Sequence, residues 1–187
     1  VVVSAEIDLA DVARFVPRVE LVAGGATRHG SEWNALRALR GSVADADVIA
    51  IHDAARPLVA AGDVRAVFAA AAREGAAMLA TAATLPALQI AGAVVTGALS
   101  PSTVRRAETP QAARAGSLFD AYERAAADDF AGTDTAAVLA RYGYPVRVVA
   151  ASAQNPKVTV PADLPRAEAL LRSCLLYTSD AADDLTR

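Results

Sequence analysis

A short apolar run that ends abruptly in charged residues limits the possible folds of this chain more than any other feature. Residues 47–51 read Asp-Val-Ile-Ala-Ile, which is typical of a strand buried in a parallel sheet, and residues 52–57 read His-Asp-Ala-Ala-Arg-Pro. Ligands in open α/β sheets bind beyond the carboxyl ends of the strands. Asp53 is therefore well placed to hold a metal ion, and Arg56 to meet a phosphate. The alternative, equally open from these residues alone, is a loop in which Asp53 is a helix N-cap.

Apolar strands and amphipathic helices alternate along most of the chain. We expect strands at residues 1–3, 19–23, 47–51, 76–81 and 146–150, with the polar residues 155–160 leading into another, and helices at 8–15, 31–40, 63–73, 115–127, 134–142 and 161–172. Ser31 is the expected N-cap of the second helix, and Gly41 its closing glycine. The alternation predicts an α/β fold with a three-layer, mostly parallel sheet.

Residues 89–96 depart from this alternation. They read as two short strands about Gly92, which predicts a β-hairpin. A hairpin in the middle of an α/β chain is often an arm over a site or towards a partner subunit. The alternative is a peripheral excursion without a role.

Composition excludes several classes of protein. The 187 residues, 54% hydrophobic and 21% charged, suffice for one domain with a proper core. A net charge of -3 argues against a nucleic-acid partner, and the single cysteine, Cys174, excludes a disulfide framework or a cysteine zinc site. No apolar run approaches the ~20 residues of a membrane span, and no export signal opens the chain. We therefore expect a cytoplasmic protein that does not enter a membrane.

Familiar nucleotide and hydrolase motifs are missing, but polar residues collect where strands are expected to end. The sequence contains no GxGxxG, no P-loop, no HExxH and no nucleophile elbow. The polar residues are paired glycines at 24–25, Asp53 with Arg56, Thr109 with Gln111, Asp134, and Lys157, which is the only lysine. Carboxylates and cations at one sheet edge suit phosphoryl transfer, which needs positioning and charge neutralisation more than covalent help.

The order and wording of these motifs resemble one enzyme family. Gly-Gly-x-Thr-Arg-x-x-Ser at 24–31, His-Asp-Ala-Ala-Arg-Pro at 52–57, Thr-Pro-Gln at 109–111, Thr-Asp at 133–134 and Asn-x-Lys-Val-Thr at 155–159 closely resemble the 2-C-methyl-D-erythritol 4-phosphate cytidylyltransferases. The resemblance implies a nucleotide-diphospho-sugar transferase fold of Rossmann-like type. It also implies a reaction in which CTP and a sugar-alcohol phosphate give a CDP-alditol and pyrophosphate. Ribitol-5-phosphate cytidylyltransferase, a close relative, shares most of the framework.

The resemblance also implies roles for individual residues, with CTP as co-substrate and Mg²⁺ as cofactor. Asp53 holds Mg²⁺, Arg56 places the triphosphate or the substrate, and Lys157 neutralises the phosphates near the α-phosphorus. The other implied contacts are Gly24, Gly25 and Ser31 with the cytosine end of CTP, and Thr84, Thr109 and either Arg105 or Arg106 with the sugar-alcohol phosphate. The hairpin arm implies a homodimer in which it reaches over the partner's site.

Some features depart from the family pattern. We interpret residues 1–172 as a cytidylyltransferase domain without the family's N-terminal glycine-rich loop, and residues 173–187 as a non-native tail that resembles sequencing-adaptor read-through. Residues 83–86 replace the family's Asp-Thr and Lys, and Glu108 stands where Gln is usual. An alternative to the active enzyme is therefore an inactive fragment or paralogue that binds only nucleotide or dimerises.

Overall fold

The computed structural model describes residues 2–3, 9–14, 19–152 and 155–183, with side chains described up to residue 173. The strands are β1 (Val2–Val3), β2 (Val22–Ala23), β3 (Val48–Ile51), β4 (Ala76–Ala82), β5 (Ala87–Ala91), β6 (Val94–Leu99), β7 (Arg105–Arg114) and β8 (Arg147–Ala150). The helices are α1 (Leu9–Ala13), α2 (Arg28–Leu39), α3 (Ala61–Glu74), α4 (Ala115–Ala127), α5 (Thr135–Arg141), the 3₁₀ turn η1 (Pro161–Asp163) and α6 (Leu164–Asp183).

The central sheet has the order β3-β7-β4-β8. β4 pairs with β8 in parallel, whereas β7 runs antiparallel between β3 and β4. Three of the four strands thus point the same way, which confirms the mostly parallel α/β prediction. The chain also forms two smaller pairs, a parallel pair of β1 with β2 and the antiparallel hairpin β5–β6.

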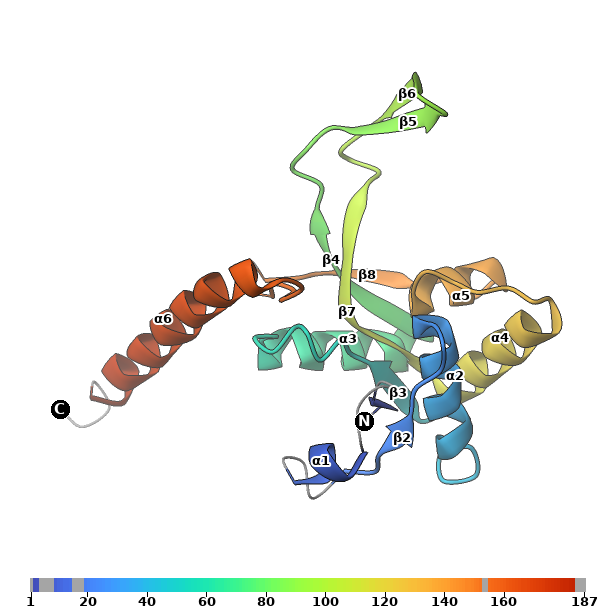
Figure 1. The fold of residues 1–187 in the computed structure, drawn as a ribbon, viewed down its shortest axis with the longest axis horizontal. Coiled ribbons are helices and arrows are strands. Elements are labelled where there is room, and N and C mark those ends of the chain that lie inside the picture. The colour runs from blue at the N-terminus through green and yellow to red at the C-terminus, as the bar shows by residue number, and fades with distance from the viewer. Residues whose placement is uncertain (1, 4–8, 15–18, 153–154, 184–187) are drawn as a thin grey trace.

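Helices cover both faces of this sheet (Figure 1). Val67, Ala70 and Ala71 of α3 pack on one face, and the other face meets a cluster from α2, α4 and α5. Neighbouring strand residues divide between the two clusters as the period of two requires, since Ala112 of β7 faces α3 and Ala113 faces α4. The result is the expected three-layer arrangement.

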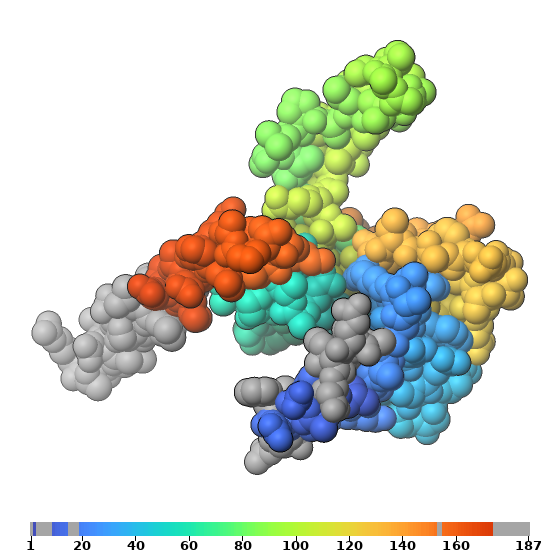
Figure 2. Space-filling model, in the orientation of Figure 1, coloured from blue at the N-terminus to red at the C-terminus, as the bar shows by residue number. Residues whose placement is uncertain are grey.

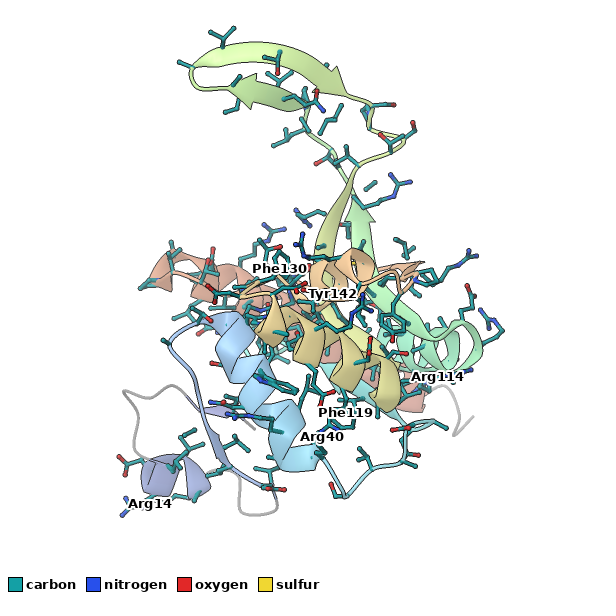
Figure 3. All side chains as sticks on the ribbon, turned by 90° about the vertical axis from the view of Figure 1, so that its right-hand side faces the viewer. Arg14, Arg40, Arg114, Phe119, Phe130 and Tyr142 are labelled. Carbon is teal, nitrogen blue, oxygen red and sulfur yellow. The ribbon has the colours of Figure 1, made fainter. Side chains whose placement is uncertain are left out.

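The outer helices are held to the core by contacts between large side chains. Figure 3 shows Arg40, at the end of α2, against Phe119 of α4, and the guanidinium lies 4.5 Å from the centroid of the phenyl ring. Arg40 also forms an ion pair with Glu123 of α4. These contacts add to the apolar packing around the buried Tyr122.

β7 reaches the site because it runs against its neighbours. Its partner residues on β3 and β4 bring Gln111 level with Ile51 and Met78. The amino-terminal half of β7 therefore lies beyond the end of β3 and beside the carboxyl-terminal half of β4. Thr109, which we expected among polar residues at the end of a strand, lies within β7 at this edge.

Helix starts follow the expected capping chemistry with one correction. The N-cap of α2 is Thr27, not Ser31, and its side chain accepts a hydrogen bond from the Gly30 N–H. Thr27 takes the role because Ser31 Oγ is engaged elsewhere. Asp134 caps α5, and its carboxylate accepts a hydrogen bond from the Ala137 N–H.

The strand expected from residues 155–160 does not form. This segment has no regular strand pairing, and it leads through η1 into α6. The Asp163 carboxylate accepts hydrogen bonds from the backbone N–H groups of Thr159 and Val160, which a sheet partner would otherwise take. α6 continues to Asp183, beyond the boundary at residue 172 that we proposed.

The hairpin of β5 and β6 is confirmed and projects well away from the sheet (Figures 1 and 2). Gly92 makes its turn with a φ of 60°, in the left-handed region that favours glycine. Along the described part of the chain, no helix is long and apolar enough to cross a membrane.

Candidate active site

Asp53 is the centre of a charged cluster at the carboxyl end of β3. Its Oδ2 atom lies 3.0 Å from Lys157 Nζ and 4.0 Å from Arg56 Nε, and its Oδ1 atom lies 3.3 Å from Arg28 Nη2. One carboxylate therefore faces three cations, which come from α2, from the loop after β3, and from the segment before η1. Asp53 is not a helix N-cap here, so the capped-loop alternative is wrong.

The loop that carries Asp53 is fixed by its own hydrogen bonds. The Asp53 N–H donates to Thr109 Oγ1 at 3.0 Å, and the same oxygen lies 3.1 Å from His52 Nδ1. His52 Nε2 lies 3.0 Å from the carbonyl oxygen of Arg56, whose N–H donates to the Asp53 carbonyl. His52 is thus a hydrogen-bonding loop residue, and Thr109 joins β7 to the loop from a buried position.

The environment of Asp53 keeps its carboxyl group ionised. Burial by itself raises its pKa, but the hydrogen bond from Lys157 and the charges of Arg28, Lys157 and Arg56 outweigh burial. The pKa of Asp53 is therefore lowered below its ordinary value. An ionised carboxylate at a strand end is the form that binds a metal ion.

Lys157 reaches Asp53 because its segment docks on the loop after β3. The Val158 N–H donates to the Ala55 carbonyl at 2.7 Å, and Arg56 Nη1 donates to the Asn155 carbonyl at 2.7 Å. The side-chain amide of Asn155 donates to the Thr109 carbonyl at 3.0 Å. The structure thus brings together Asp53, Arg56, Thr109 and Lys157, which the sequence placed in three separate motifs.

The glycine motif sits beside this cluster at the start of α2. The Gly25 N–H donates to Ser31 Oγ at 3.0 Å, and Ser31 Oγ donates to the Thr27 carbonyl. A Cβ on Gly25 would lie 2.8 Å from the Gly30 carbonyl carbon, so the close approach requires glycine. With Gly24 alongside, this turn ends β2 near the first turn of α2, from which Arg28 extends to Asp53.

A polar cavity of about 300 Å³ lies next to Asp53's cations. Its lining includes Arg56, Arg106, Glu108, Asn155 and Lys157. Three of the residues around it carry buried side-chain atoms without a hydrogen-bond partner in the described structure, namely Arg56 Nε, Ser152 Oγ and Asn155 Oδ1. Unsatisfied buried polar groups normally meet water or a ligand, so this cavity is suited to a small, polar, anionic ligand.

The two candidate arginines of β7 differ in position. Arg106 lines the cavity and pairs with Glu108 at 3.2 Å. Arg105 instead donates to the carbonyl groups of Pro101, Ser102 and Val104 in the turn before β7. Of the two, Arg106 is therefore the better placed to meet a substrate in this cavity.

Thr84 lies apart from the cluster within a single chain. It is exposed in the segment between β4 and β5, at the base of the arm. A contact between Thr84 and a substrate stays a prediction, as do the other site roles carried over from the family.

Three residues that the sequence analysis gave no role belong to the cluster. Arg28 bridges Asp53, Glu32 and the Thr133 carbonyl, while Glu108 and Asn155 form the wall of the cavity. Arg28 and Asn155 lie inside the motifs at 24–31 and 155–159, so their positions in those motifs could have identified them as site residues. His29 lies in α2 and stacks on Tyr122 with ring centroids 4.8 Å apart.

A magnesium site at Asp53 is compatible with this donor set. The described residues contain no group of three or more His, Cys, Asp and Glu side chains arranged to hold a metal by themselves. Mg²⁺ is commonly held by one or two carboxylates together with substrate phosphates and water, so a lone ionised carboxylate fits a metal that arrives with a nucleotide.

Comparisons with known proteins agree on one family. The family model of 2-C-methyl-D-erythritol 4-phosphate cytidylyltransferase matches residues 1–173. The enzyme of that name from Geobacter metallireducens is 38% identical over 155 residues, covering 83% of this chain and 67% of the relative. The Aquifex aeolicus enzyme is 38% identical over 160 residues, covering 84% and 71%. The chain thus spans about two thirds of the length of the curated relatives it matches.

Solved structures with the same description share the fold. The Thermus thermophilus cytidylyltransferase superposes with a TM-score of 0.71 at 31% identity, covering 83% of this chain and 78% of that one. The Francisella tularensis protein superposes with a TM-score of 0.72 at 29% identity, covering 80% and 71%.

Proposed function

From the premise that this chain belongs to the 2-C-methyl-D-erythritol 4-phosphate cytidylyltransferase family, we propose that it transfers the cytidylyl group of CTP to that sugar-alcohol phosphate. A phosphate oxygen of 2-C-methyl-D-erythritol 4-phosphate attacks the α-phosphorus of CTP. The bond between the α-phosphorus and the bridging oxygen breaks, and pyrophosphate leaves. The product is a precursor in the non-mevalonate route to isoprenoids.

The observation that carries this proposal is the convergence of Lys157, Arg56 and Arg28 on Asp53. No protein nucleophile is needed, because the attacking oxygen belongs to the substrate. What the reaction requires is in-line placement and neutralisation of developing negative charge. We assign neutralisation of the phosphates near the α-phosphorus to Lys157, and placement of the triphosphate or substrate to Arg56.

Asp53 is the proposed ligand of Mg²⁺. When bound, the ion would neutralise phosphate oxygens of CTP and help to hold them in line. Asp53 then has two tasks, because it also pairs with Lys157 at 3.0 Å and so holds the ammonium group at the site. Gly24, Gly25 and Ser31 are the proposed contacts of the cytosine end.

The cavity beside Arg56 is the proposed site of the sugar-alcohol phosphate. Its cations suit the phosphate and its unpartnered amide and hydroxyl oxygens suit the hydroxyl groups. Arg106 is the preferred β7 arginine for this phosphate because it lines the cavity. Thr109 supports the wall from its buried position.

We also propose that the protein is a homodimer joined through the arm. Leu85, Ile90 and Val94 are 77%, 67% and 65% exposed on the hairpin or at its base. So many exposed apolar side chains on one projection favour a protein partner. Thr84, at the base of the arm, would then reach the partner's site. A cytoplasmic location follows from the proposed use of CTP, because nucleoside triphosphates are held inside the cell.

Pyrophosphate release tests the proposed reaction. The chain is given Mg²⁺ and CTP with either 2-C-methyl-D-erythritol 4-phosphate or ribitol 5-phosphate, and CTP binding is measured by calorimetry on the same preparation. Release that depends on methylerythritol phosphate supports the proposal. Release of pyrophosphate with ribitol 5-phosphate alone would identify that compound as the substrate. CTP binding without pyrophosphate release from either compound would favour the non-catalytic alternative.

A further inference from the structure

Glu108 is a buried carboxylate with four side-chain partners. Its side chain is 2% exposed, in the middle of β7. Oε1 accepts from Thr81 Oγ1 at 3.0 Å and lies 3.2 Å from Arg106 Nη2. Oε2 accepts from Asn155 Nδ2 at 3.0 Å and lies 3.6 Å from Arg56 Nη1. Burying a charge is costly unless it is paired, and both oxygens are paired here.

The partners of Glu108 are the side chains that line the polar cavity. Arg56 Nη1 is held between the Asn155 carbonyl and Glu108, so its guanidinium has a fixed orientation. Its Nε atom is buried without a hydrogen-bond partner in the described structure. This arrangement uses Nη1 of the guanidinium for support, whereas Nε has only the 4.0 Å ion pair with Asp53 Oδ2.

Arg106 depends on Glu108 in a different way. Its side chain is 72% exposed, and a long exposed side chain has many rotamers of similar energy. The contact with the buried, fixed carboxylate selects rotamers that keep the guanidinium at the cavity. Glu108 thus joins a mobile cation on β7 to a buried cation in the loop after β3.

We propose that Glu108 is a positioning residue that presents Arg56 and Arg106 to the phosphate of the sugar-alcohol substrate. Through Asn155 it also anchors the segment that carries Lys157. This inference rests on the function proposed above. It differs from a purely structural role, in which Glu108 would merely tie β7 to β4 and to Asn155.

The variant Glu108→Gln separates the two roles. Glutamine has nearly the same shape as glutamate. It can still accept a hydrogen bond from Asn155 and form one with Thr81, but it cannot form ion pairs with the two arginines. We expect the KM for methylerythritol phosphate to rise about tenfold, the loss expected from one charge-assisted contact. The KM for CTP should rise less than the KM for methylerythritol phosphate, because the cytosine end is bound elsewhere and Arg56 keeps its contacts with Asn155 and Asp53.

Glu74→Gln is the matched control. Glu74 also pairs with two arginines, Arg73 at 2.7 Å and Arg147 at 3.6 Å, but it ends α3 and does not line the cavity. Its replacement should change neither KM. An equal rise in the KM for methylerythritol phosphate in both variants would overturn the proposal.

A double-variant cycle gives the sharpest test. If Glu108 acts partly by holding Arg106, Glu108→Gln should cost clearly less in an Arg106→Gln background than in the wild type. Full independence of the two changes would overturn the positioning of Arg106. A lower melting temperature and kcat with both KM values unchanged would make Glu108 structural, and a lower KM for methylerythritol phosphate would show that its charge only repels the substrate.

Failure of this inference is distinguishable from failure of the proposed function. Calorimetric binding of methylerythritol phosphate to the same proteins gives the comparison without turnover. A wild-type chain that neither binds this substrate nor releases pyrophosphate contradicts both proposals. A wild-type chain that does so, with Glu108→Gln unchanged in binding and KM, contradicts the role of Glu108 alone.

Discussion

The sheet-edge cluster and the hairpin arm differ in where their side chains find contacts. The cluster, formed by Arg28, Asp53, Arg56, Glu108 and Lys157, gathers charges from distant segments and pairs them with one another. The arm, formed by β5 and β6, has an internal ladder of hydrogen bonds and exposed apolar side chains. Figure 2 shows it standing clear of the body on the face in view.

The two regions differ in how far the contacts of their side chains are satisfied within one chain. The cluster has its oppositely charged partners already in place, so its geometry is set by the fold of a single subunit. The arm gains little from that fold, because two strands alone are marginally stable in water. Its apolar side chains find burial only against another surface. The charged side chains of the cluster thus have partners within the subunit, whereas the arm leaves an apolar surface exposed, as the proposed homodimer requires.

Replacing Lys157 should give the largest effect, and it tests whether the paired charges of the cluster carry the reaction. Lys157→Ala removes the cation next to Asp53, and we expect kcat to fall at least about 100-fold, as when an electrostatic stabiliser of a transition state is lost. The pair is partly exposed, so stability should change by less than about 1 kcal/mol. Steady-state kinetics and thermal melts measure both. A full rate in Lys157→Ala would remove its proposed role.

Charging the arm should give the next largest effect, on assembly alone. Ile90→Asp with Val94→Asp places carboxylates on the exposed apolar surface, and we expect the dimer dissociation constant to rise by at least about 30-fold, the cost of truncating an interface hot spot. Sedimentation velocity measures this constant, with Leu171→Asp on α6 as the control. Dimers that persist in the arm variant would show that the arm does not hold the subunits together.

Removing Arg28 should weaken the fold moderately. Arg28 joins α2 to Asp53 and to the Thr133 carbonyl, so Arg28→Ala should lower the free energy of unfolding by about 2 kcal/mol. Arg14→Ala is the control, because its pair with Asp11 at 4.0 Å is exposed and should be worth less than about 0.5 kcal/mol. Equal losses in urea titrations of the two variants would deny Arg28 its structural role.

The smallest expected effect is on the pH dependence of folding stability. It should differ in sign between Asp53 and Glu32, the two carboxylates that Arg28 contacts. The pKa of Asp53 is lowered, so its stabilising contribution is present above its unfolded value near 3.8 and is lost as the pH falls through the folded pKa. Burial raises the pKa of Glu32 despite the opposing contacts with Tyr122 and Arg28. Its contribution is therefore greatest below about 4.5 and declines as the pH rises through the folded pKa.

Unfolding titrations at several pH values test these signs. Relative to the wild type, Asp53→Asn should lose less stability on acidification below pH 3.8. Glu32→Gln should compare more favourably with the wild type at pH 7 than at pH 4, because the glutamine does not ionise. The same pH trend in both variants would contradict the assignment.

Local patterns predicted most of the helices and strands but not β7. Periodicity located α3, α4 and β4 within one or two residues, since each has a clear apolar face or run. β7 was missed because it holds Pro110 and few residues of high strand propensity, and proline in a central strand argues against that assignment. The antiparallel course of β7 then brings Glu108 and Thr109 to the site, which no local pattern indicates.

The failure at residues 155–160 has a tertiary cause. Val158, Thr159 and Val160 have high strand propensity, yet their N–H groups donate to the Ala55 carbonyl and to the Asp163 carboxylate. These partners depend on how the segment docks, which the sequence does not display locally. The motifs pointed to Lys157 and Asp53 as candidate site residues, but their 3.0 Å contact is a property of the fold that no motif displays.

The most direct test of the account is the rate of pyrophosphate release by the wild type and by Asp53→Asn across a magnesium titration, with CTP and methylerythritol phosphate at saturation. If Asp53 is the centre of the site, release by the variant should fall at least about 100-fold, and its far-UV spectrum should match that of the wild type. Added Mg²⁺ should recover only part of that loss. A variant that matches the wild-type rate at every magnesium concentration would contradict the claim that the reaction takes place at this sheet edge.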